Sequence, residues 1–205
     1  LTVPNQELVN IGTSAFYKVN PEKIIIREDA QSISESFLEL TNLTAFEMTK
    51  AAEEGEAGVF EVQEDVLFVN KEAGKELLRY PMAKADLEEY TVPNNVVSIA
   101  EYAFSATVIK KVVLPEGLQT IVARTFDKCT SLEEIVIPNR VVSIGEYAFN
   151  KCTALKTLVL GANVTEIGER AFYECSAVTE LTVPNQELVN IETSAFYKVN
   201  PEKII

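Results

Sequence analysis

The stretch VVSIGEYAFNKCTALKTLVLG at residues 141–161 decides the fold, because similar stretches recur on both sides of it. Aligned on its phenylalanine, the units are spaced 22, 23, 23 and 24 residues apart, with anchors at Phe104, Phe126, Phe149, Phe172 and Phe196. Self-similarity at a period of this size is typical of repeat architectures. One unit is too short to bury its own apolar face, so we expect the units to stack as coils.

Each unit contains an L-x-x-L-x-L block after its phenylalanine, as at Leu155, Leu158 and Leu160. The end of this block alternates apolar and polar residues, which is the period of two expected of a β-strand. A proline or glycine ends each block, at Pro93, Pro115, Pro138, Gly161 and Pro184. Proline fixes φ and lacks a backbone donor, so the strand should stop there and the chain should turn. A second short apolar segment, such as VVSI, follows before the next phenylalanine.

The chain before the regular units keeps the same spacing. Leu43, Phe46 and Met48 follow Phe37 at the offsets that the leucines of the regular block have from Phe149. The stretch SFLELTNLTAFEM around them is therefore predicted as a diverged coil, and its propensities leave a helix as the alternative.

The stretch DVLFVNKEAGKELLRYP at residues 65–81 predicts a β-hairpin. Two apolar runs surround a turn that contains Gly74, and Pro81 closes the second run. The L-x-x-L-x-L block returns directly afterwards at Leu87 and Tyr90, so the hairpin interrupts the series of coils without ending it.

The pattern V-x-x-I-G-x-x-A-F-x-x-C-x-x-L-x-x-L-x-L at residues 141–160 resembles the BspA-like leucine-rich repeat family, and the hairpin is similar to an insertion common there. The resemblance covers almost the whole chain; Leu40, Thr107 and Val199 depart from it where the family usually has Cys or Asn. It implies an α/β-type repeat fold that is mostly β, a right-handed leucine-rich-repeat solenoid with a parallel sheet on one face and a β-hairpin insertion. It also implies an extracellular or cell-surface protein, often an adhesin for host proteins.

We predict a single solenoid over residues 1–205 with about nine coils. Residues 1–48 are expected to form N-terminal coils, 49–86 irregular coils with the hairpin, and 87–205 regular coils. The chain begins without methionine or a signal-like segment, which is typical of a piece of a longer repeat protein.

The two ends of the chain are nearly identical, because residues 1–25 match residues 181–205 at 24 of 25 positions. Stacking requires similar apolar spacing only, so identity at polar positions indicates duplication of a larger unit, and we expect the parent chain to continue with a sequence like IREDAQSISESF. An artificial repetition is the alternative. The single difference, Gly12 against Glu192, indicates that this repeat position does not require a positive φ.

The charge balance excludes several classes of function. The chain carries 18 basic and 31 acidic residues, a net charge of −13, and no histidine. Without imidazole, histidine-based triads and most zinc or non-haem iron sites are excluded. An acidic chain lacks the basic surface that nucleic acids and anionic lipids require. No apolar run is long enough to span a bilayer. We therefore predict no enzymatic activity, no catalytic residue, and no metal or other cofactor. We also predict no nucleic-acid partner and no membrane insertion.

Three cysteines recur at the coil period, at Cys129, Cys152 and Cys175. Stacking places them about 4.8 Å apart, within disulfide range for Cα atoms, but their Cβ vectors run parallel and their number is odd. We therefore predict a column of buried, reduced thiols, with a disulfide or redox role as the alternative. The phenylalanine anchors are likewise predicted as a core column.

Acidic residues concentrate in residues 27–92, which hold 16 of the 31 against 6 basic residues. The run Glu53, Glu54 and Glu56 is interpreted as a solvated acidic loop. Catalysis by two carboxylates is left open as a third reading, because it requires only a pocket with two convergent acids.

The outward positions of the strand blocks form three columns across successive coils. Two columns alternate acidic and basic side chains, and the third is an uncharged β-branched stripe. Such a face is suited to a protein ligand, and its candidate residues are Thr91, Lys110, Lys111, Val113, Glu133, Glu134, Val136, Lys156, Val159 and Thr182. The alternative is that these residue types serve only strand stability.

The leading hypothesis for function is therefore a non-enzymatic protein-binding module of a cell-surface or secreted protein, with an extracellular protein as ligand. A structural spacer with no ligand of its own is the alternative. The identity of the ligand and the oligomeric state stay open.

Overall fold

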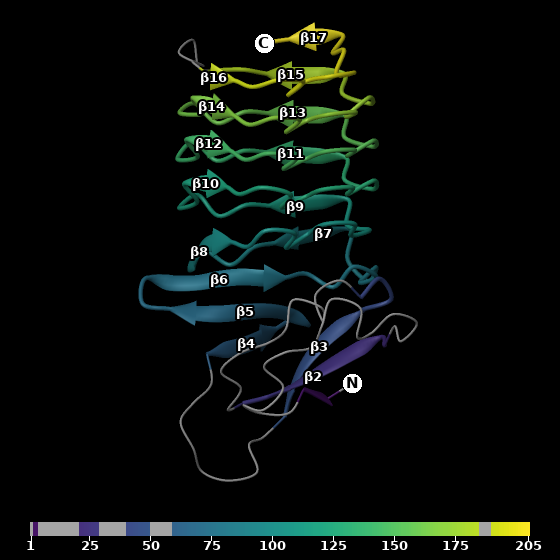
Figure 1. The fold of residues 1–205 in the computed structure, drawn as a ribbon, viewed down its shortest axis with the longest axis vertical. Helices are drawn as coiled ribbons and strands as arrows, with labels where there is room; N and C mark the ends of the chain where they lie inside the picture. Colours follow the sequence, from purple (N-terminus) through teal and green to yellow (C-terminus); the bar gives the residue numbers. More distant parts are fainter. Residues whose placement is uncertain (1, 4–20, 29–39, 50–58, 185–189) are drawn as a thin grey trace.

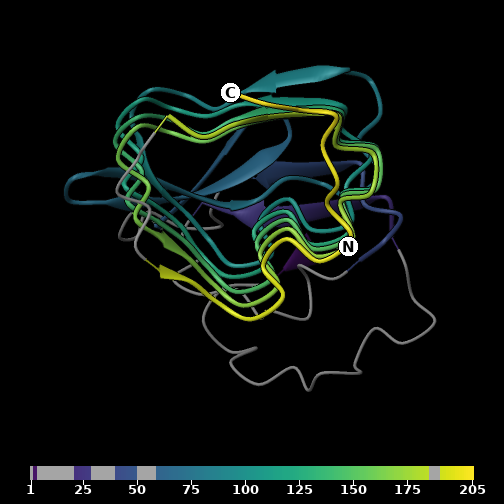
Figure 2. The same ribbon diagram turned by 90° about the horizontal axis from the view of Figure 1, so that it is seen from above.

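The computed structural model describes residues 2–3, 21–28, 40–49, 59–184 and 190–205. Their regular elements are all β-strands, with no helix among them. Figure 1 shows the coils stacked one on another along the longest axis, and Figure 2 shows successive coils overlying each other when viewed from above. The predicted mostly-β solenoid is confirmed.

One side of the solenoid is a six-stranded parallel sheet with one strand from each of six successive coils. Its register follows the repeat, because Ile135 pairs with Leu158 and Leu158 pairs with Leu181. The backbone hydrogen bonds of this sheet therefore join one coil to the next. In spatial order its strands are β17 (Lys203–Ile204), β15 (Glu180–Thr182), β13 (Thr157–Val159), β11 (Glu134–Val136), β9 (Lys111–Val113) and β7 (Glu89–Thr91).

In the four coils after the first regular coil, the second short apolar segment forms a second parallel sheet, which the sequence indicated only as an apolar segment. Prolines such as Pro138 stand between the two sheets, where the chain turns. The inward residues Ile121, Ile144 and Ile167 pair along the axis at the coil period. The strands are β10 (Thr120–Ile121), β12 (Ser143–Ile144), β14 (Glu166–Ile167) and β16 (Asn190–Ile191).

The third side of each coil, here called the loop side, consists of residues 101–106, 123–128, 146–151, 169–174 and 193–198. The second and sixth residues of every loop have a positive φ although none is glycine. This conformation is uncommon for side chains with a Cβ, and hydrogen bonds between coils hold it here: the N–H of Arg124 donates to Glu146 O (3.0 Å) and that of Lys128 to Asn150 O (2.7 Å). The position of Gly145 and Glu192 has no positive φ, as predicted.

A column of stacked aromatic rings runs through the core. Ring centroids of Phe104, Phe126, Phe149, Phe172 and Phe196 are 4.9 to 5.2 Å apart, with interplanar angles of 10° or less. Tyr80 extends this column, because its ring stacks on Phe104 at 5.4 Å and its N–H donates to Ala103 O. The phenylalanine column is confirmed, and the hairpin contributes a sixth ring that the sequence analysis did not identify.

The three cysteines are buried and free, as predicted. The Sγ atom of each donates to the carbonyl of the anchor phenylalanine of the preceding coil, for example Cys152 to Phe126 O at 3.2 Å. Burial raises the pKa of the Cys152 thiol well above its ordinary value, and the neighbouring cysteines raise it further. The column is therefore a structural part of the core.

The predicted hairpin is confirmed as β5 (Val66–Lys71) and β6 (Gly74–Arg79), which pair antiparallel. It belongs to a four-stranded sheet in the order β4-β5-β6-β8. β4 (Phe60–Gln63) was not expected, and β8 (Val96–Ile99) is the second segment of the first regular coil. Because β6 pairs parallel with β8, the hairpin is also the base on which the regular coils stack.

The first part of the chain contributes a three-stranded parallel sheet in the order β1-β2-β3, which are β1 (Thr2–Val3), β2 (Lys23–Arg27) and β3 (Ala45–Thr49). Leu43 and Phe46 are buried and β3 is a strand, so the described part of the predicted coil is confirmed and the helix alternative is wrong there. These strands have a small core of their own with Phe60 and Leu67. Phe37 and the acidic run at 53–56 lie outside the described residues.

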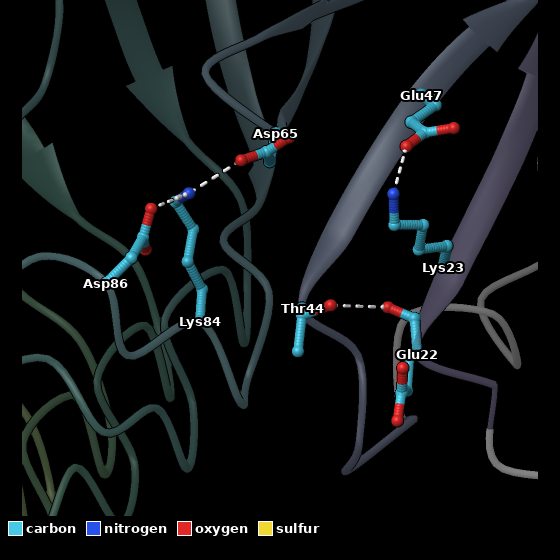
Figure 3. A network of polar contacts seen from close by, with 7 residues as sticks. All are labelled: Glu22, Lys23, Thr44, Glu47, Asp65, Lys84 and Asp86. Atoms are coloured by element: carbon cyan, nitrogen blue, oxygen red, sulfur yellow. Dashed lines mark hydrogen bonds and ion pairs between the residues drawn. The ribbon is translucent and has the colours of Figure 1, made fainter.

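Polar contacts hold this first part and the hairpin in place (Figure 3). Lys84 is 5% exposed and its Nζ lies 2.6 Å from Asp65 and 2.9 Å from Asp86. Desolvation lowers the pKa of Lys84, but the two carboxylates outweigh it, and the pKa is raised overall. On the neighbouring strands, Lys23 pairs with Glu47 at 2.6 Å. Lys84 thus joins the β4–β5 turn to the segment that enters the first regular coil.

The number of coils, the division at residues 48 and 86 and the duplication stay predictions. The duplicated segments do pair alike where they are described: Thr2 pairs with Ile25, and at the equivalent place Val183 N–H donates to Ile205 O.

Candidate interaction surfaces on the sheet face and the loop side

The six-stranded sheet brings the predicted site residues together on one outward face. Its strands alternate, so that Val112, Ile135 and Leu158 are buried whereas Val113 and Val136 are 38% and 49% exposed. The β-branched stripe predicted from the sequence therefore exists as a continuous row, which consists of Thr91, Val113, Val136, Val159 and Thr182. Whether this row binds a ligand stays a prediction.

The charged columns beside the stripe are paired along the solenoid axis. Lys110 Nζ lies 2.6 Å from Glu88, and Lys156 Nζ lies 2.7 Å from Glu133. The hydrogen bond and the charge of Glu88 raise the pKa of Lys110, and those of Lys156 lower the pKa of Glu133. Exposed pairs of this kind contribute little to stability, and they hold the charged groups in fixed positions on the face.

The second charged column shares one lysine between two carboxylates. Lys111 Nζ lies 3.3 Å from Glu89 and 3.8 Å from Glu134. A shallow hollow of about 200 Å³ lies between these charges and the stripe, bordered by Val113, Val136 and Pro138. This is below the volume of about 300 Å³ at which small-molecule pockets begin, so the face suits a flat protein surface better than a small ligand.

The loop side carries an aromatic and cationic column that the sequence analysis missed. We call Tyr102, Arg124, Tyr147 and Arg170 the Tyr–Arg column; all four occupy the second loop position of successive coils. The Arg124 guanidinium carbon lies 5.9 Å from the Tyr102 ring centroid and 4.9 Å from that of Tyr147. Arg170 lies 5.6 Å from Tyr147 and donates to its hydroxyl. The sequence carries a signal for this column, because the residue two positions before each of the first four anchor phenylalanines alternates tyrosine and arginine.

Carboxylates border the Tyr–Arg column on the same coils. Arg124 lies 3.4 Å from Glu101 and 3.7 Å from Glu146, and Arg170 lies 3.6 Å from Glu169. Each guanidinium therefore has aromatic rings on its faces and a carboxylate near its edge, an arrangement that exploits both cation–π attraction and ion pairing.

A larger cavity of about 560 Å³ opens at the foot of the Tyr–Arg column. Leu78 and Met82 from the end of the hairpin, Tyr102 and Ala106 from the first loop, and Asp127 from the next loop contribute to its wall. Its volume lies in the range of ordinary ligand pockets.

Within the described part of the chain, no group of three or more His, Cys, Asp or Glu side chains is placed to hold a metal ion. No helix found there has the length and apolar character needed to cross a membrane. Tyr80 and Tyr90 are core residues whose hydroxyl pKa values are raised by burial. The pKa of Tyr80 is raised to about 12, and that of Tyr90 is raised further.

The stacked coils, the periodic inward leucines and the aromatic column define a leucine-rich-repeat solenoid. The chain belongs to the family described as the BspA type leucine rich repeat region, whose pattern matches residues 1–70 and 75–202 in six copies. A search of curated proteins gives no match.

Solved bacterial structures share the fold. A leucine-rich repeat protein from Eubacterium ventriosum is 25% identical over 86% of this chain and 46% of its own, with a TM-score of 0.74. A leucine rich cell surface protein from Faecalibacterium prausnitzii is 21% identical over 84% of this chain and 50% of its own, with a TM-score of 0.62. The pneumococcal vaccine antigen PcpA is 22% identical over 82% and 46%, with a TM-score of 0.60. The chain thus spans about half the length of each.

Proposed function

We propose that the chain is a non-enzymatic protein-binding module of a cell-surface or secreted bacterial protein, and that it adheres to an extracellular host or matrix protein through the six-stranded sheet. The observation that carries the proposal is the outward face of that sheet. There an exposed β-branched stripe runs beside charged groups whose positions are already fixed by ion pairs.

The physical case rests on what binding would cost and gain. Protein interfaces place an apolar centre inside a polar rim, and the stripe around Val113 and Val136 offers such a centre. The flanking side chains Lys110, Glu133 and Lys156 are already paired, so little side-chain entropy is lost when a partner covers them. Their alternating signs would set the register of a complementary partner more than the affinity.

Surface location is supported by the family and by two structural neighbours, which are described as a cell surface protein and a vaccine antigen. These descriptions belong to those proteins. For the present chain, the proposal predicts that an antibody raised against residues 87–184 labels intact cells of the organism that encodes it.

The experiment that tests binding is a screen of the purified chain against immobilised extracellular matrix and plasma proteins, followed by variants. The triple variant Val113→Glu, Val136→Glu and Val159→Glu places three carboxylates in the stripe without changing any buried residue. Binding to the partner found in the screen should fall at least about tenfold, because the apolar centre of the interface would have to desolvate charge.

A matched control adds the same charge elsewhere. Val97, Val108 and Val142 are 41%, 42% and 46% exposed, and none lies on a strand of the six-stranded sheet. Their replacement by glutamate should leave binding unchanged. Equal loss in both triple variants would mean that net charge, and not the stripe, governs binding; unchanged binding in the stripe variant would overturn the proposal.

A structural spacer is the second candidate, and the ion pairs themselves favour it. Every pair on the sheet face named above joins neighbouring coils, so the charges of Lys110, Lys111 and Lys156 can be explained by stacking alone. In that case the chain should bind nothing in the screen, and the stripe variant should have the same thermal stability and solution behaviour as the unaltered chain.

A further inference from the structure

The cavity at the foot of the Tyr–Arg column exists because the hairpin coil is shorter than the regular coils. Leu77 pairs with Ile99, and Tyr80 stacks on Phe104, so these are equivalent positions in the two coils. Only residues 78–79 lie between Leu77 and Tyr80, whereas residues 100–103 lie between Ile99 and Phe104. The hairpin coil therefore has no residue at the position of the Tyr–Arg column.

The alternation of that column indicates which side chain is missing. Tyrosine at 102 and 147 alternates with arginine at 124 and 170, and the alternation ends at Ser194 in the last coil. Below Tyr102, the residue that continues the alternation is an arginine. Arg124 covers one face of the Tyr102 ring at 5.9 Å. Tyr102 also lines the cavity, and its side chain is exposed, with 44% of the residue accessible.

The chain itself shows how a guanidinium is bound in this setting. Arg124 lies between the rings of Tyr102 and Tyr147 with the carboxylates of Glu101 and Glu146 at 3.4 and 3.7 Å. The cavity offers the same kinds of group: the ring of Tyr102, and the carboxylates of Glu101 and of Glu76 from β6. Apolar side chains complete the wall, and they suit the methylene stem of a long basic side chain.

The wall of the cavity carries both carboxylates and cations. Asp127 is a third carboxylate in the wall, where it accepts a hydrogen bond from Asn150 at 2.6 Å. Two cations also line the wall. Arg79 is 1% exposed, and its guanidinium donates to the carbonyls of Tyr102 and Ser105, so it is directed into the loop backbone. Lys128 lies 3.8 Å from Asp127.

Glu76 is additionally paired with Lys71 at 3.1 Å, on the hairpin. Three carboxylates and two cations line the cavity, and each carboxylate has a cation beside it: Lys71 beside Glu76, Arg124 beside Glu101 and Lys128 beside Asp127. The chain as a whole carries −13. The net charge of the chain therefore attracts a cationic group over long range.

We propose that this cavity binds an arginine side chain of a protein partner. The guanidinium lies on the face of Tyr102 opposite Arg124, beside Glu101 and Glu76, and its stem lies against Leu78 and Met82. The ligand continues the alternation of the Tyr–Arg column by one member. Arginine is preferred over lysine because its planar group stacks on an aromatic ring and meets a carboxylate at the same time.

The test uses N-acetyl-arginine amide as the probe, titrated into the isotopically labelled chain at low ionic strength and followed by NMR. Amide resonances of residues 78–82 and 101–106 should shift, with a Kd of about 1 mM, which is ordinary for one side chain. N-acetyl-citrulline amide has the same shape without the charge and should not shift them. Added salt should weaken the arginine response.

Two matched pairs of variants locate the site. Tyr102→Leu should weaken binding of the arginine probe at least about threefold. Tyr173→Leu should not change it, because Tyr173 lies beside Arg170 at the far end of the column, 5.7 Å from its guanidinium carbon. Glu101→Gln should weaken binding as well. Glu146 also pairs with Arg124 but does not line the cavity, so Glu146→Gln should have no effect on binding. The stripe variant of the sheet face should still bind the probe, which separates this site from the proposed function.

Equal shifts with arginine and citrulline probes would overturn the proposal, because charge would then play no part. Shifts at residues 78–82 that persist in both Tyr102→Leu and Glu101→Gln would overturn it too. Absence of any shift up to about 20 mM probe, roughly twentyfold the expected Kd, would show that the cavity does not take this side chain.

Discussion

The regular coils at residues 87–184 and the hairpin junction at residues 59–86 consist of similar strands, but different contacts hold them. In the regular coils each kind of side chain contacts its own kind one coil away: phenylalanine rings stack at about 5 Å and thiols follow thiols. In the hairpin junction the strand register shifts twice, and the cations Arg79 and Lys84 are buried. Repetition explains nearly every inward residue of the regular coils, so sites are expected at the outward faces and where the repetition stops.

The largest loss of stability should come from breaking the aromatic column inside the regular coils. Phe149 is fully buried with rings stacked on both sides, so Phe149→Ala should lower the free energy of unfolding by about 3–5 kcal/mol. Denaturant titration followed by circular dichroism measures this change. Val142→Ala, at a position 46% exposed, is the control and should stay within about 0.5 kcal/mol of the unaltered chain. A loss below 1 kcal/mol for Phe149→Ala would contradict the importance of the column.

A smaller effect is expected at the hairpin junction, where one buried lysine joins two acidic residues. Lys84→Met keeps the length of the side chain but removes its bonds to Asp65 and Asp86, which should cost about 1.5–3 kcal/mol. The same denaturant titration applies, with Lys71→Met on an exposed lysine as the control. An unchanged midpoint for Lys84→Met would show that packing alone holds the junction.

The contribution of Lys84 should also depend on pH. The hydrogen bond from Lys84 lowers the pKa of Asp86. The stabilisation from Asp86 is therefore complete above pH 3.8, the ordinary pKa of aspartate, and is lost as the pH falls through the lowered pKa of the folded state. The pKa of Lys84 is raised. The stabilisation from Lys84 is therefore complete below pH 10.5, the ordinary pKa of lysine, and is lost as the pH rises through the raised pKa of the folded state. The stability difference between the unaltered chain and Lys84→Met should therefore be constant from about pH 5 to 9 and shrink in acid. A difference that grows in acid would contradict this assignment.

Tyr80 sharpens the comparison, because it is the one ring of the aromatic column that comes from the hairpin junction. Its hydroxyl is buried with no hydrogen-bond partner among the described residues, and an unpaired polar group is costly to bury. Tyr80→Phe should therefore leave the unfolding midpoint unchanged or raise stability by up to about 1 kcal/mol. Tyr147→Phe, which removes an acceptor of Arg170, is the comparison variant. A clear loss of stability in Tyr80→Phe would mean that the hydroxyl has a structural role.

The smallest loss of stability should come from removing an ion pair in the charged columns of the sheet face. Lys110→Gln removes the exposed pair with Glu88, and the unfolding midpoint should not change measurably in physiological salt. Melting curves recorded at low and high salt check this. A large, salt-dependent loss would favour the spacer function, because the ion pairs would then be there for stability.

The periodic parts of the fold could be predicted because stacking repeats one pattern. The spacing of Phe104 to Phe172, the cysteines and the inward leucines placed the core, and the alternation of Val113 and Val136 with apolar neighbours placed the outward stripe. The hairpin followed from its two apolar runs around Gly74. These features depend on local alternation and on a constant period, both of which are visible in one sequence.

The sequence did not predict features of two kinds. In one kind the residue type changes from one coil to the next, and in the other the repeat period is interrupted. Tyr80 was not recognised as a member of the aromatic column because it is not a phenylalanine, although it precedes Phe104 by the longest spacing seen between anchors. The Tyr–Arg column lies in loops where only apolar spacing was considered. The burial of Arg79 and Lys84 could not be predicted, since long cations are usually exposed and only the junction geometry encloses these two.

The central claim is that stacking holds the regular coils as one cooperative unit and that the hairpin junction is held separately. Native-state hydrogen exchange tests it most directly. The amides of Phe126 and Phe149, which donate to the next coil, should exchange with one common high free energy, and the amide of Asn70, which bonds to Val59 within the junction, should exchange at a clearly lower one. Equal protection in both regions, or slower exchange in the junction than in the coils, would contradict the account.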